Sequence, residues 1–407
     1  MPALPQRVLW VLDYFPRPHE PTTGVWGVET VLALARQGLS VTVLALTPWI
    51  PAWCGVTRSL RGWAAVPDRT TISDIQIYYP KAPYYPHRLV TRLVYHHVPL
   101  LDGPWLWRWC AAPVERMMQA HRFQLVHAGF VYPNGFIGRE IARRYGIPLL
   151  VHELSPQRLA AAQQHPWRRR LYAKVMRDAA AVLTPNGQLA EQLRAMAPTQ
   201  RIVVLPVGVD PPKSEACRQA RPAAYQHRRV VLSVGALNER KGHAVLLQAM
   251  AQVRRRVPEA HLIIIGNGPQ RRRLQQLAKT LGLAGSVELW GARPHAEVLA
   301  AMSWCDLFVL PSWGEAFGAV YAEALSFARP VIACAGEGFS EVARDEVHAL
   351  LVAPRDPASL SRAILRLLTD AALAERLGRS GRALVDDALT TGAIAARLRA
   401  VYAECLA

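Results

Sequence analysis

Short apolar runs alternate along the whole chain with longer stretches whose apolar positions recur at helical spacing. In the first half these runs predict buried parallel strands, and residues 27–37 between two of them predict a helix with an apolar stripe. The predicted strands are residues 8–12, 41–46, 125–127, 148–151 and 181–184. Alternation at this spacing is typical of a doubly wound α/β domain.

The second half repeats the pattern. Strands are predicted at residues 230–234, 262–265, 287–289, 307–310 and 330–333. The pattern weakens at residues 206–222, which are rich in Pro, Lys and Arg. The chain is therefore expected to form two Rossmann-like domains, residues 1–206 and 207–390, that face a central cleft where a ligand binds at the carboxyl ends of the strands.

Composition supports a folded chain. Of 407 residues, 51% are hydrophobic, and no apolar run approaches the roughly 20 residues that span a bilayer. The first residues lead directly into a strand, which predicts no signal peptide. Six scattered cysteines without a Cys-x-x-Cys pair indicate reduced thiols. We therefore expect a cytoplasmic protein.

The net charge of +18 is concentrated in the first half, where residues 1–205 hold 23 of the 48 basic and only 11 of the 30 acidic residues. Cations and aromatic rings interleave over residues 75–122, and residues 165–170 add a second basic cluster. The rings are Tyr78, Tyr79, Tyr84, Tyr85, Trp105, Trp107 and Trp109, and the cations include Lys81, Arg88, Arg92, Arg108 and Arg116. This mixture predicts peripheral attachment to an anionic membrane, on its inner face, although half of the rings could belong to the core. No known nucleic-acid-binding motif occurs, so nucleic acid is not an expected partner.

The stretch from Pro311 to Gly318 follows a predicted strand and opens a helix. A polar turn with glycines before a helix N-terminus is suited to a phosphate or diphosphate. Glu315 lies in the turn and Glu323 lies about one turn into the helix. One carboxylate can reach a ligand at the turn, and the other can accept hydrogen bonds from a diol.

This Pro-Ser-x-x-Glu-x-Phe-Gly run, with a second Glu eight positions on, resembles the donor-binding motif of the family 4 retaining glycosyltransferases, which have the GT-B fold. The resemblance implies that Glu315 contacts the transferred sugar and that Glu323 accepts from the nucleotide ribose. The backbone amides of Phe317, Gly318 and Ala319 would meet the sugar and diphosphate. It also implies that the last helix, in residues 391–407, packs back on the first domain.

Four other segments of the second half match the family. Residues 234–242 resemble its diphosphate clamp and include Gly235 and Lys241, whose cation would neutralise the departing phosphates. The family arginine of this clamp is Ala236 here, and we hypothesise that Arg240 supplies part of the missing charge. Gly266 would let neighbouring backbone approach the nucleotide, and Gly291 would lie near the base. Residues 337–341 match a family loop to which we assign no role.

In the first half, Gly24 lies in a loop that closes over the donor phosphates in the family, although ordinary turns look the same. His127 matches the first position of a His-x-His pattern whose second position is Gly129 here. His127 is therefore expected either to touch the donor sugar or to be a structural histidine. His152 also matches a family position, and Glu153 beside it would orient acceptor hydroxyls or simply be solvated.

No Asp-x-Asp and no His/Cys/Asp cluster with ligand spacing occurs, which predicts a metal-independent enzyme without cofactor. The expected activity is retaining transfer of a hexose from a UDP- or GDP-sugar to a glycan or lipid-linked acceptor, in surface polysaccharide or glycolipid synthesis. A sugar-nucleotide epimerase of similar shape and a basic nucleic-acid- or membrane-binding protein are the alternatives. An NAD enzyme is less well supported because no strand precedes Gly-x-Gly-x-x-Gly.

Overall fold

The computed structural model describes residues 6–20, 24–51, 57–82, 104–210 and 219–407. The chain forms two compact units, unit 1 (Met1–Pro206 with Ile394–Ala407) and unit 2 (Val207–Ala393). Some predicted features lie outside the described residues. They are residues 21–23 of the Gly24 loop, residues 211–218 of the linker, Tyr84, Tyr85, Arg88 and Arg92.

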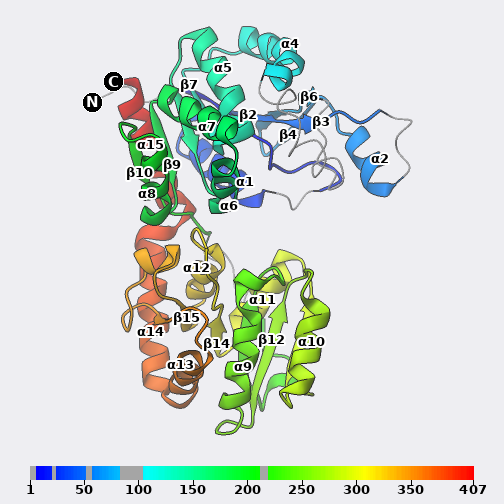
Figure 1. The fold of residues 1–407 in the computed structure, drawn as a ribbon, viewed down its shortest axis with the longest axis vertical. Coiled ribbons are helices and arrows are strands. Elements are labelled where there is room, and N and C mark those ends of the chain that lie inside the picture. The colour runs from blue at the N-terminus through cyan, green and yellow to red at the C-terminus, as the bar shows by residue number, and fades with distance from the viewer. Residues whose placement is uncertain (1–5, 21–23, 52–56, 83–103, 211–218) are drawn as a thin grey trace. The chain divides into compact units, whose positions relative to one another are not determined.

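Unit 1 is built on an eight-stranded sheet that is parallel except at its β5–β4 edge (Figure 1). The order is β10 (Ile202–Val204), β9 (Ala181–Thr184), β8 (Leu149–His152), β7 (Leu125–Gly129), β1 (Arg7–Leu12), β2 (Ser40–Ala45), β5 (Ile75–Tyr78), β4 (Arg69–Ile72). A separate pair joins β3 (Thr47–Pro48) and β6 (Lys81–Ala82). The first strand has β2 on one side and β7 on the other, so strand order reverses there. In open α/β sheets ligands bind at the carboxyl ends of strands beside such a switch point.

The central strands of unit 1 are apolar on both faces because helices cover both sides. Val8, Trp10 and Leu12 pack with α1 (Val25–Arg36) and α15 (Thr391–Leu406). Leu9 and Val11 point the other way. They pack with the helices α4 (Pro104–Ala120), α5 (Phe136–Tyr145), α6 (Pro156–Gln163), α7 (Pro166–Asp178) and α8 (Gly187–Met196). The short helix α2 (Arg58–Ala64) precedes β4.

Unit 2 has a six-stranded, wholly parallel sheet. Its order is β13 (Val287–Gly291), β12 (Ala260–Ile265), β11 (Arg229–Val234), β14 (Leu307–Val309), β15 (Val331–Cys334), β16 (Leu350–Val352). One face is covered by α9 (His243–Val253), α10 (Arg271–Thr280) and α13 (Pro357–Thr369), and the other by α11 (His295–Trp304) and α12 (Ala319–Ser326). The helix α14 (Ala371–Leu384) follows α13. Here β11 lies between β12 and β14, so the switch point is the β11–β14 pair.

The prediction of two doubly wound domains is confirmed, and each predicted strand is present with ends shifted by no more than two residues. Six strands of the described residues were not predicted: β3, β4, β5, β6, β10 and β16. Among the described residues, no helix combines the length and apolarity needed to cross a membrane.

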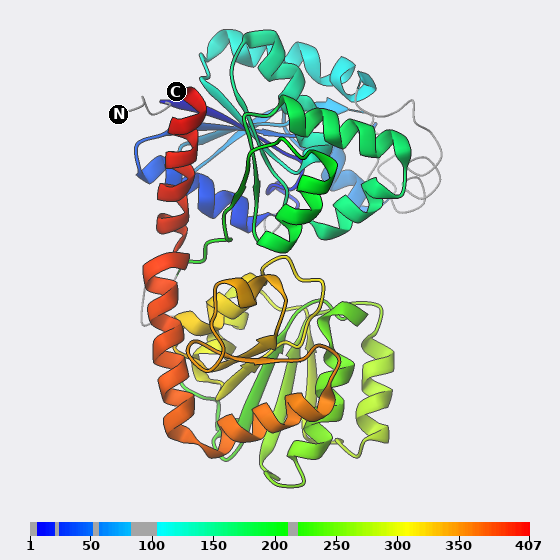
Figure 2. The ribbon, with the colours of Figure 1, turned by 60° about the vertical axis from the view of Figure 1, so that its left-hand side comes forward.

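The end of α15 belongs to unit 1, the packing that the family resemblance implies (Figure 2). Ile394, Leu398 and Tyr402 pack in the same core cluster as the strand residues Leu125 and Leu150. The buried Tyr402 hydroxyl accepts a hydrogen bond from Trp10 Nε1 at 3.0 Å and is bonded to His127 Nδ1 at 2.7 Å. One hydroxyl thus joins α15 to two central strands.

Replacing Tyr402 with Phe should leave the indole N–H and the imidazole nitrogen buried without their partner, at a cost of about 1–3 kcal/mol. Amide hydrogen exchange in β1 and β7 should accelerate by roughly 5- to 150-fold. Tyr145→Phe is the control, since the Tyr145 hydroxyl of α5 makes no hydrogen bond to the described residues. Equal protection in both variants would show that the Tyr402 bonds do not stabilise this packing.

Candidate functional site

The two loops that leave the switch point of unit 2 are held together by an ion pair. Lys241 follows β11, Glu315 follows β14, and the Lys241 ammonium donates to the Glu315 carboxylate. Both side chains are largely shielded, at 18% and 19% exposed. A cation and a carboxylate predicted from separate motifs therefore meet at the edge where this fold binds ligands.

Local turn chemistry sets the position of Lys241. The Asn238 side chain caps a short 3-10 turn and accepts from the Lys241 backbone N–H at 3.3 Å. Gly242 then takes a left-handed conformation (φ 68°), and a Cβ there would lie 2.1 Å from the Pro311 carbonyl oxygen. Only glycine permits this close approach between the two loops.

Arg240 also bridges these loops. Its backbone carbonyl accepts from Trp313 N–H at 2.8 Å, and its guanidinium donates to the Gly314 carbonyl at 2.9 Å. The side chain therefore lies beside the turn that carries Glu315. This location is compatible with the hypothesis that Arg240 supplies charge in place of the family arginine at Ala236, which stays a prediction.

Hydrogen bonds with Tyr321, Glu337 and Gly338 hold the turn that carries Glu315. The Tyr321 hydroxyl donates to the Leu310 carbonyl at 2.7 Å and lies 2.8 Å from Ser312 Oγ. The Glu315 N–H donates to the Glu337 carboxylate at 2.9 Å, and the Glu315 carbonyl accepts from Gly338 at 3.2 Å. Residues 337–341, to which the sequence assigned no role, thus position Glu315.

At the start of α12, Gly318 is the left-handed N-cap (φ 78°), and a Cβ there would collide with the Tyr321 ring at 2.5 Å. Phe317 is buried against Phe339, with ring centroids 6.4 Å apart, so its side chain is not available to a ligand. Ala319 begins the helix. These observations leave the amides at the helix N-terminus as the group that can meet an anion.

Glu323 lies further along α12 and contacts His295 of α11, with Glu323 Oε1 3.1 Å from His295 Nε2. Sequence reasoning missed this histidine, because nothing in its separation of 28 positions from Glu323 indicates the contact. Half of the His295 side chain is exposed. The Glu323 carboxylate thus has the His295 imidazole as a polar partner, and the hydroxyls of a diol could replace the imidazole in hydrogen bonds to this carboxylate.

In unit 2, the three remaining glycines predicted at the donor site pack backbone against backbone. A Cβ on Gly266 would lie 1.9 Å from the Gly235 carbonyl oxygen, and Gly266 N–H donates to the Gly291 carbonyl at 2.9 Å. Trp290, beside Gly291, directs its indole N–H to the Glu288 carboxylate at 2.8 Å. What the structure supports for these glycines is close loop packing, and their contact with a nucleotide stays a prediction.

His127 lies in the core of unit 1, which favours the structural histidine over contact with the donor sugar, the two alternatives that the sequence left open. It has no exposed surface, its ring lies 4.2 Å from that of Trp10, and the Tyr402 hydroxyl bonds its Nδ1. Burial holds the pKa of His127 well below its usual value, so the ring is neutral. The missing second histidine is also explained: a Cβ on Gly129 would lie 2.3 Å from Leu12 Cδ2.

The structure also shows the surroundings of two further candidate residues of unit 1, Gly24 and Glu153. Gly24 is the left-handed N-cap of α1 (φ 70°), where a Cβ would lie 2.3 Å from the Tyr14 carbonyl oxygen. Glu153 is buried rather than solvated, and it accepts from Val131 N–H at 3.1 Å and Ser155 N–H at 2.9 Å. Burial raises the pKa of Glu153 to about 6. Among the described residues, no cluster of three or more His, Cys, Asp or Glu is arranged to hold a metal ion.

Comparison with known families gives two matches. Residues 27–208 match the family described as glycosyl transferase 4-like domain, and residues 218–384 match glycosyl transferases group 1. Together they cover most of both units.

Comparison with individual proteins also identifies glycosyltransferases. A D-inositol 3-phosphate glycosyltransferase of Segniliparus rotundus is 31% identical over 284 residues, 65% of this chain but only 62% of that protein. A GDP-mannose-dependent alpha-(1-6)-phosphatidylinositol monomannoside mannosyltransferase of Mycolicibacterium smegmatis is 29% identical, over 67% of this chain and 74% of its own. The structure of sucrose-phosphate synthase from Thermosynechococcus elongatus superposes with a TM-score of 0.76 at 23% identity, covering 98% of both chains. The predicted GT-B fold is confirmed.

The ion-paired loops predict how nucleotide binding responds to mutation. Lys241→Gln should weaken UDP or GDP binding about tenfold to a hundredfold, because a charge-assisted phosphate contact is lost. Arg240→Gln should weaken it by a smaller factor, roughly threefold to tenfold. Isothermal titration calorimetry of the full chain measures both.

Arg379→Gln, on the exposed face of α14, makes the same change of charge outside these loops and should leave the affinity unaltered. If Arg240→Gln binds like this control while Lys241→Gln does not, Arg240 does not compensate for Ala236.

Proposed function

Because the chain belongs to the group 1 glycosyltransferase family, we propose that it transfers a sugar from a UDP- or GDP-linked donor to a glycan or lipid-linked acceptor, with retention of anomeric configuration. The Lys241–Glu315 ion pair at the switch point of unit 2 carries the proposal. It puts the phosphate-neutralising cation and the sugar-contacting carboxylate within one hydrogen bond of each other. The donor binds unit 2 and the acceptor binds unit 1.

In this proposal the donor diphosphate lies at the N-terminus of α12 and takes Lys241 as its counter-ion. Glu323 accepts hydrogen bonds from the ribose, and Glu315 contacts the sugar. The bond between the anomeric carbon and the diphosphate oxygen breaks while the acceptor oxygen bonds to the same face of that carbon. The acceptor proton passes to the leaving diphosphate, whose charge Lys241 stabilises. No side-chain nucleophile is needed.

The relatives support the substrate classes. The names of two of them specify an inositol phosphate and a phosphatidylinositol glycolipid, and one of these names GDP-mannose as donor. An acceptor of that kind, in glycolipid or surface polysaccharide synthesis, agrees with the basic character of residues 1–205.

A donor panel tests the activity. Incubation with UDP- and GDP-sugars and a glycolipid fraction should release nucleoside diphosphate only when acceptor is present, and proton NMR of the product should show the anomeric configuration of the donor. Glu315→Gln should lower kcat about 100-fold, whereas Glu375→Gln, which changes an exposed carboxylate of α14 outside these loops, should not. Conversion of the donor into another nucleotide sugar without acceptor would instead identify an epimerase.

We also propose that α4 attaches unit 1 to an anionic membrane, on its inner face. Trp105 and Trp109 are 37% and 43% exposed and lie one helical turn apart, with ring centroids separated by 6.0 Å. The exposed Arg108 lies between them, whereas Leu106 and Cys110 face the core. Aromatic rings and a cation on one helix face suit the headgroup region of a bilayer.

Replacing Trp105 and Trp109 with Ser should reduce co-flotation with phosphatidylglycerol vesicles at least threefold, because the rings supply the apolar contact. Trp49→Ser is the matched control, since this residue of unit 1 is 47% exposed but lies outside α4. Equal loss in both variants, or flotation that added salt does not weaken, would contradict this attachment.

A further inference from the structure

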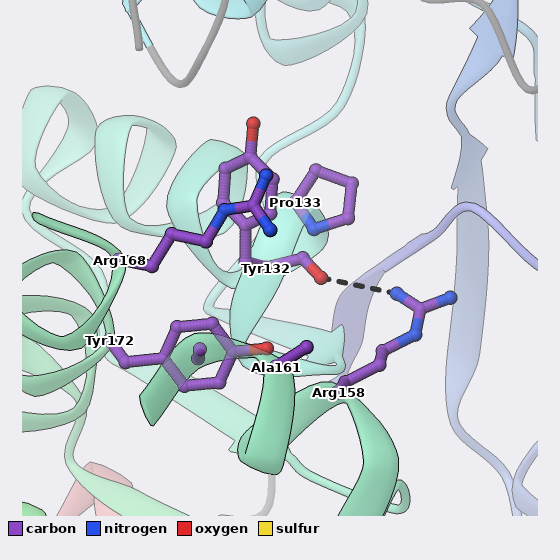
Figure 3. A pocket seen from close by; sticks show the side chains of 7 residues that line it. Tyr132, Pro133, Arg158, Ala161, Arg168 and Tyr172 are labelled. Atoms are coloured by element: carbon purple, nitrogen blue, oxygen red, sulfur yellow. Dashed lines mark hydrogen bonds between the residues drawn. The ribbon is translucent and has the colours of Figure 1, made fainter. Parts of the chain in front are cut away.

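Unit 1 contains a pocket of about 210 Å³ at the ligand-binding edge of its sheet (Figure 3). It is lined by Tyr132 and Pro133, Arg158 and Ala161 of α6, and Arg168 and Tyr172 of α7. Tyr132 and Pro133 follow β7, the strand beside the switch point, and α6 follows β8. The pocket therefore occupies the place in unit 1 that corresponds, in this topology, to a substrate site.

The walls of this pocket suit one ring-sized group. The rings of Tyr132, Tyr172 and Pro133 form apolar surfaces. The polar groups are the tyrosine hydroxyls and the guanidinium groups of Arg158 and Arg168 (Figure 3). Its volume is below the roughly 300–1,000 Å³ of sites for drug-sized molecules. A sugar or cyclitol ring presents C–H groups to such walls and hydroxyls to their polar edges.

At the Arg158 end of the pocket, hydrogen bonds hold the guanidinium in place and a carboxylate balances its charge. Arg158 Nη1 donates to the Tyr132 carbonyl at 3.1 Å, and Nη2 lies 3.1 Å from the Asp13 carboxylate. Its guanidinium carbon lies 4.0 Å from the centroid of the Phe130 ring. Asp13, which also accepts from Asn134 Nδ2 at 2.8 Å, balances the charge of Arg158. This end therefore offers directed hydrogen bonding without a net positive charge.

The Arg168 end lies at the basic start of α7, where the Arg168 guanidinium carbon is 5.0 Å from the centroid of the Trp167 ring. Near its start α7 has three consecutive arginines, Arg168 to Arg170, and its single carboxylate, Asp178, is at the other end and pairs with Arg139. Of the three, only Arg168 lines the pocket, whereas Arg169 and Arg170 are exposed. A planar guanidinium at the rim of an aromatic-walled pocket is suited to a phosphate group.

We propose that this pocket receives the acceptor as a phosphorylated polyol, with the hydroxylated ring between Tyr132 and Tyr172 and the phosphate on Arg168. The inference rests on the proposed function and specifies the acceptor's chemical class. A phosphate ester of this kind occurs both in soluble sugar or cyclitol phosphates and in the headgroup of an inositol lipid, so the test separates the two sources.

The test measures binding to the full chain by calorimetry, using pairs of probes that differ only in a phosphate: inositol 3-phosphate against inositol, and glucose 6-phosphate against glucose. At least one phosphorylated probe should bind tenfold or more tightly than its neutral partner. Arg168→Gln should remove that preference, and Arg168→Lys should retain part of it, because lysine keeps the charge without the fork. Arg169→Gln makes the same change of charge one residue away and should alter the affinity less than twofold.

A second arm uses phosphatidylcholine vesicles with and without phosphatidylinositol. Binding that requires phosphatidylinositol and falls in Arg168→Gln but not Arg169→Gln identifies the lipid headgroup, whereas a response to soluble probes alone identifies a free phosphate ester. Equal losses in the two variants, or no preference for any phosphorylated probe, would overturn the inference. UDP and GDP are titrated in parallel: if they bind but the phosphorylated polyols do not, the acceptor assignment fails and the proposed transfer stands.

Discussion

The ion pair between Lys241 and Glu315 is the interaction on which the candidate site of unit 2 depends, because it joins the loops that leave two neighbouring strands. A shielded ion pair contributes little net stability, since desolvation of both charges opposes their attraction. Its consequence belongs to the proposed reaction, in which an arriving phosphate would compete with Glu315 for the same ammonium. Binding of the diphosphate would then exchange one anion for another around Lys241, and Glu315 would be released toward the sugar.

Both units contain a sheet with a switch point, but different kinds of residue lie at the two switch points. At the switch point of unit 2, charged side chains meet above the sheet, and glycines such as Gly242 let the loops approach closely. In unit 1 the corresponding strands carry Trp10 and His127, which α15 covers through Tyr402. Hydrogen bonds between these neutral groups stabilise the packing of the chain end in that core.

Much of the fold and of the candidate site could be predicted, because apolar runs and the motifs at strand ends consist of residues that are close together in the sequence. Glu315 and Lys241 were selected as site candidates in this way, and the structure shows that their side chains meet. In contrast, β10 and β4 were missed because they are short and half-exposed. Contacts between distant segments gave no local signal. Glu337, which fastens the Glu315 backbone, and His295, which contacts Glu323, are of this kind. The burial of His127 depends on Tyr402, 275 residues later.

Glu153 shows why position at a strand end does not determine what a carboxylate does. After β8 it is in the place where side chains usually meet water, yet the segment that follows β7 covers it and supplies the Val131 N–H, while Ser155 supplies the other donor. With Glu153 occupied by backbone donors and Asp13 by Arg158 and Asn134, the nearby carboxylates are already engaged. A ligand entering this edge of unit 1 therefore meets aromatic rings and guanidinium groups, which favours an anionic acceptor over a cationic one.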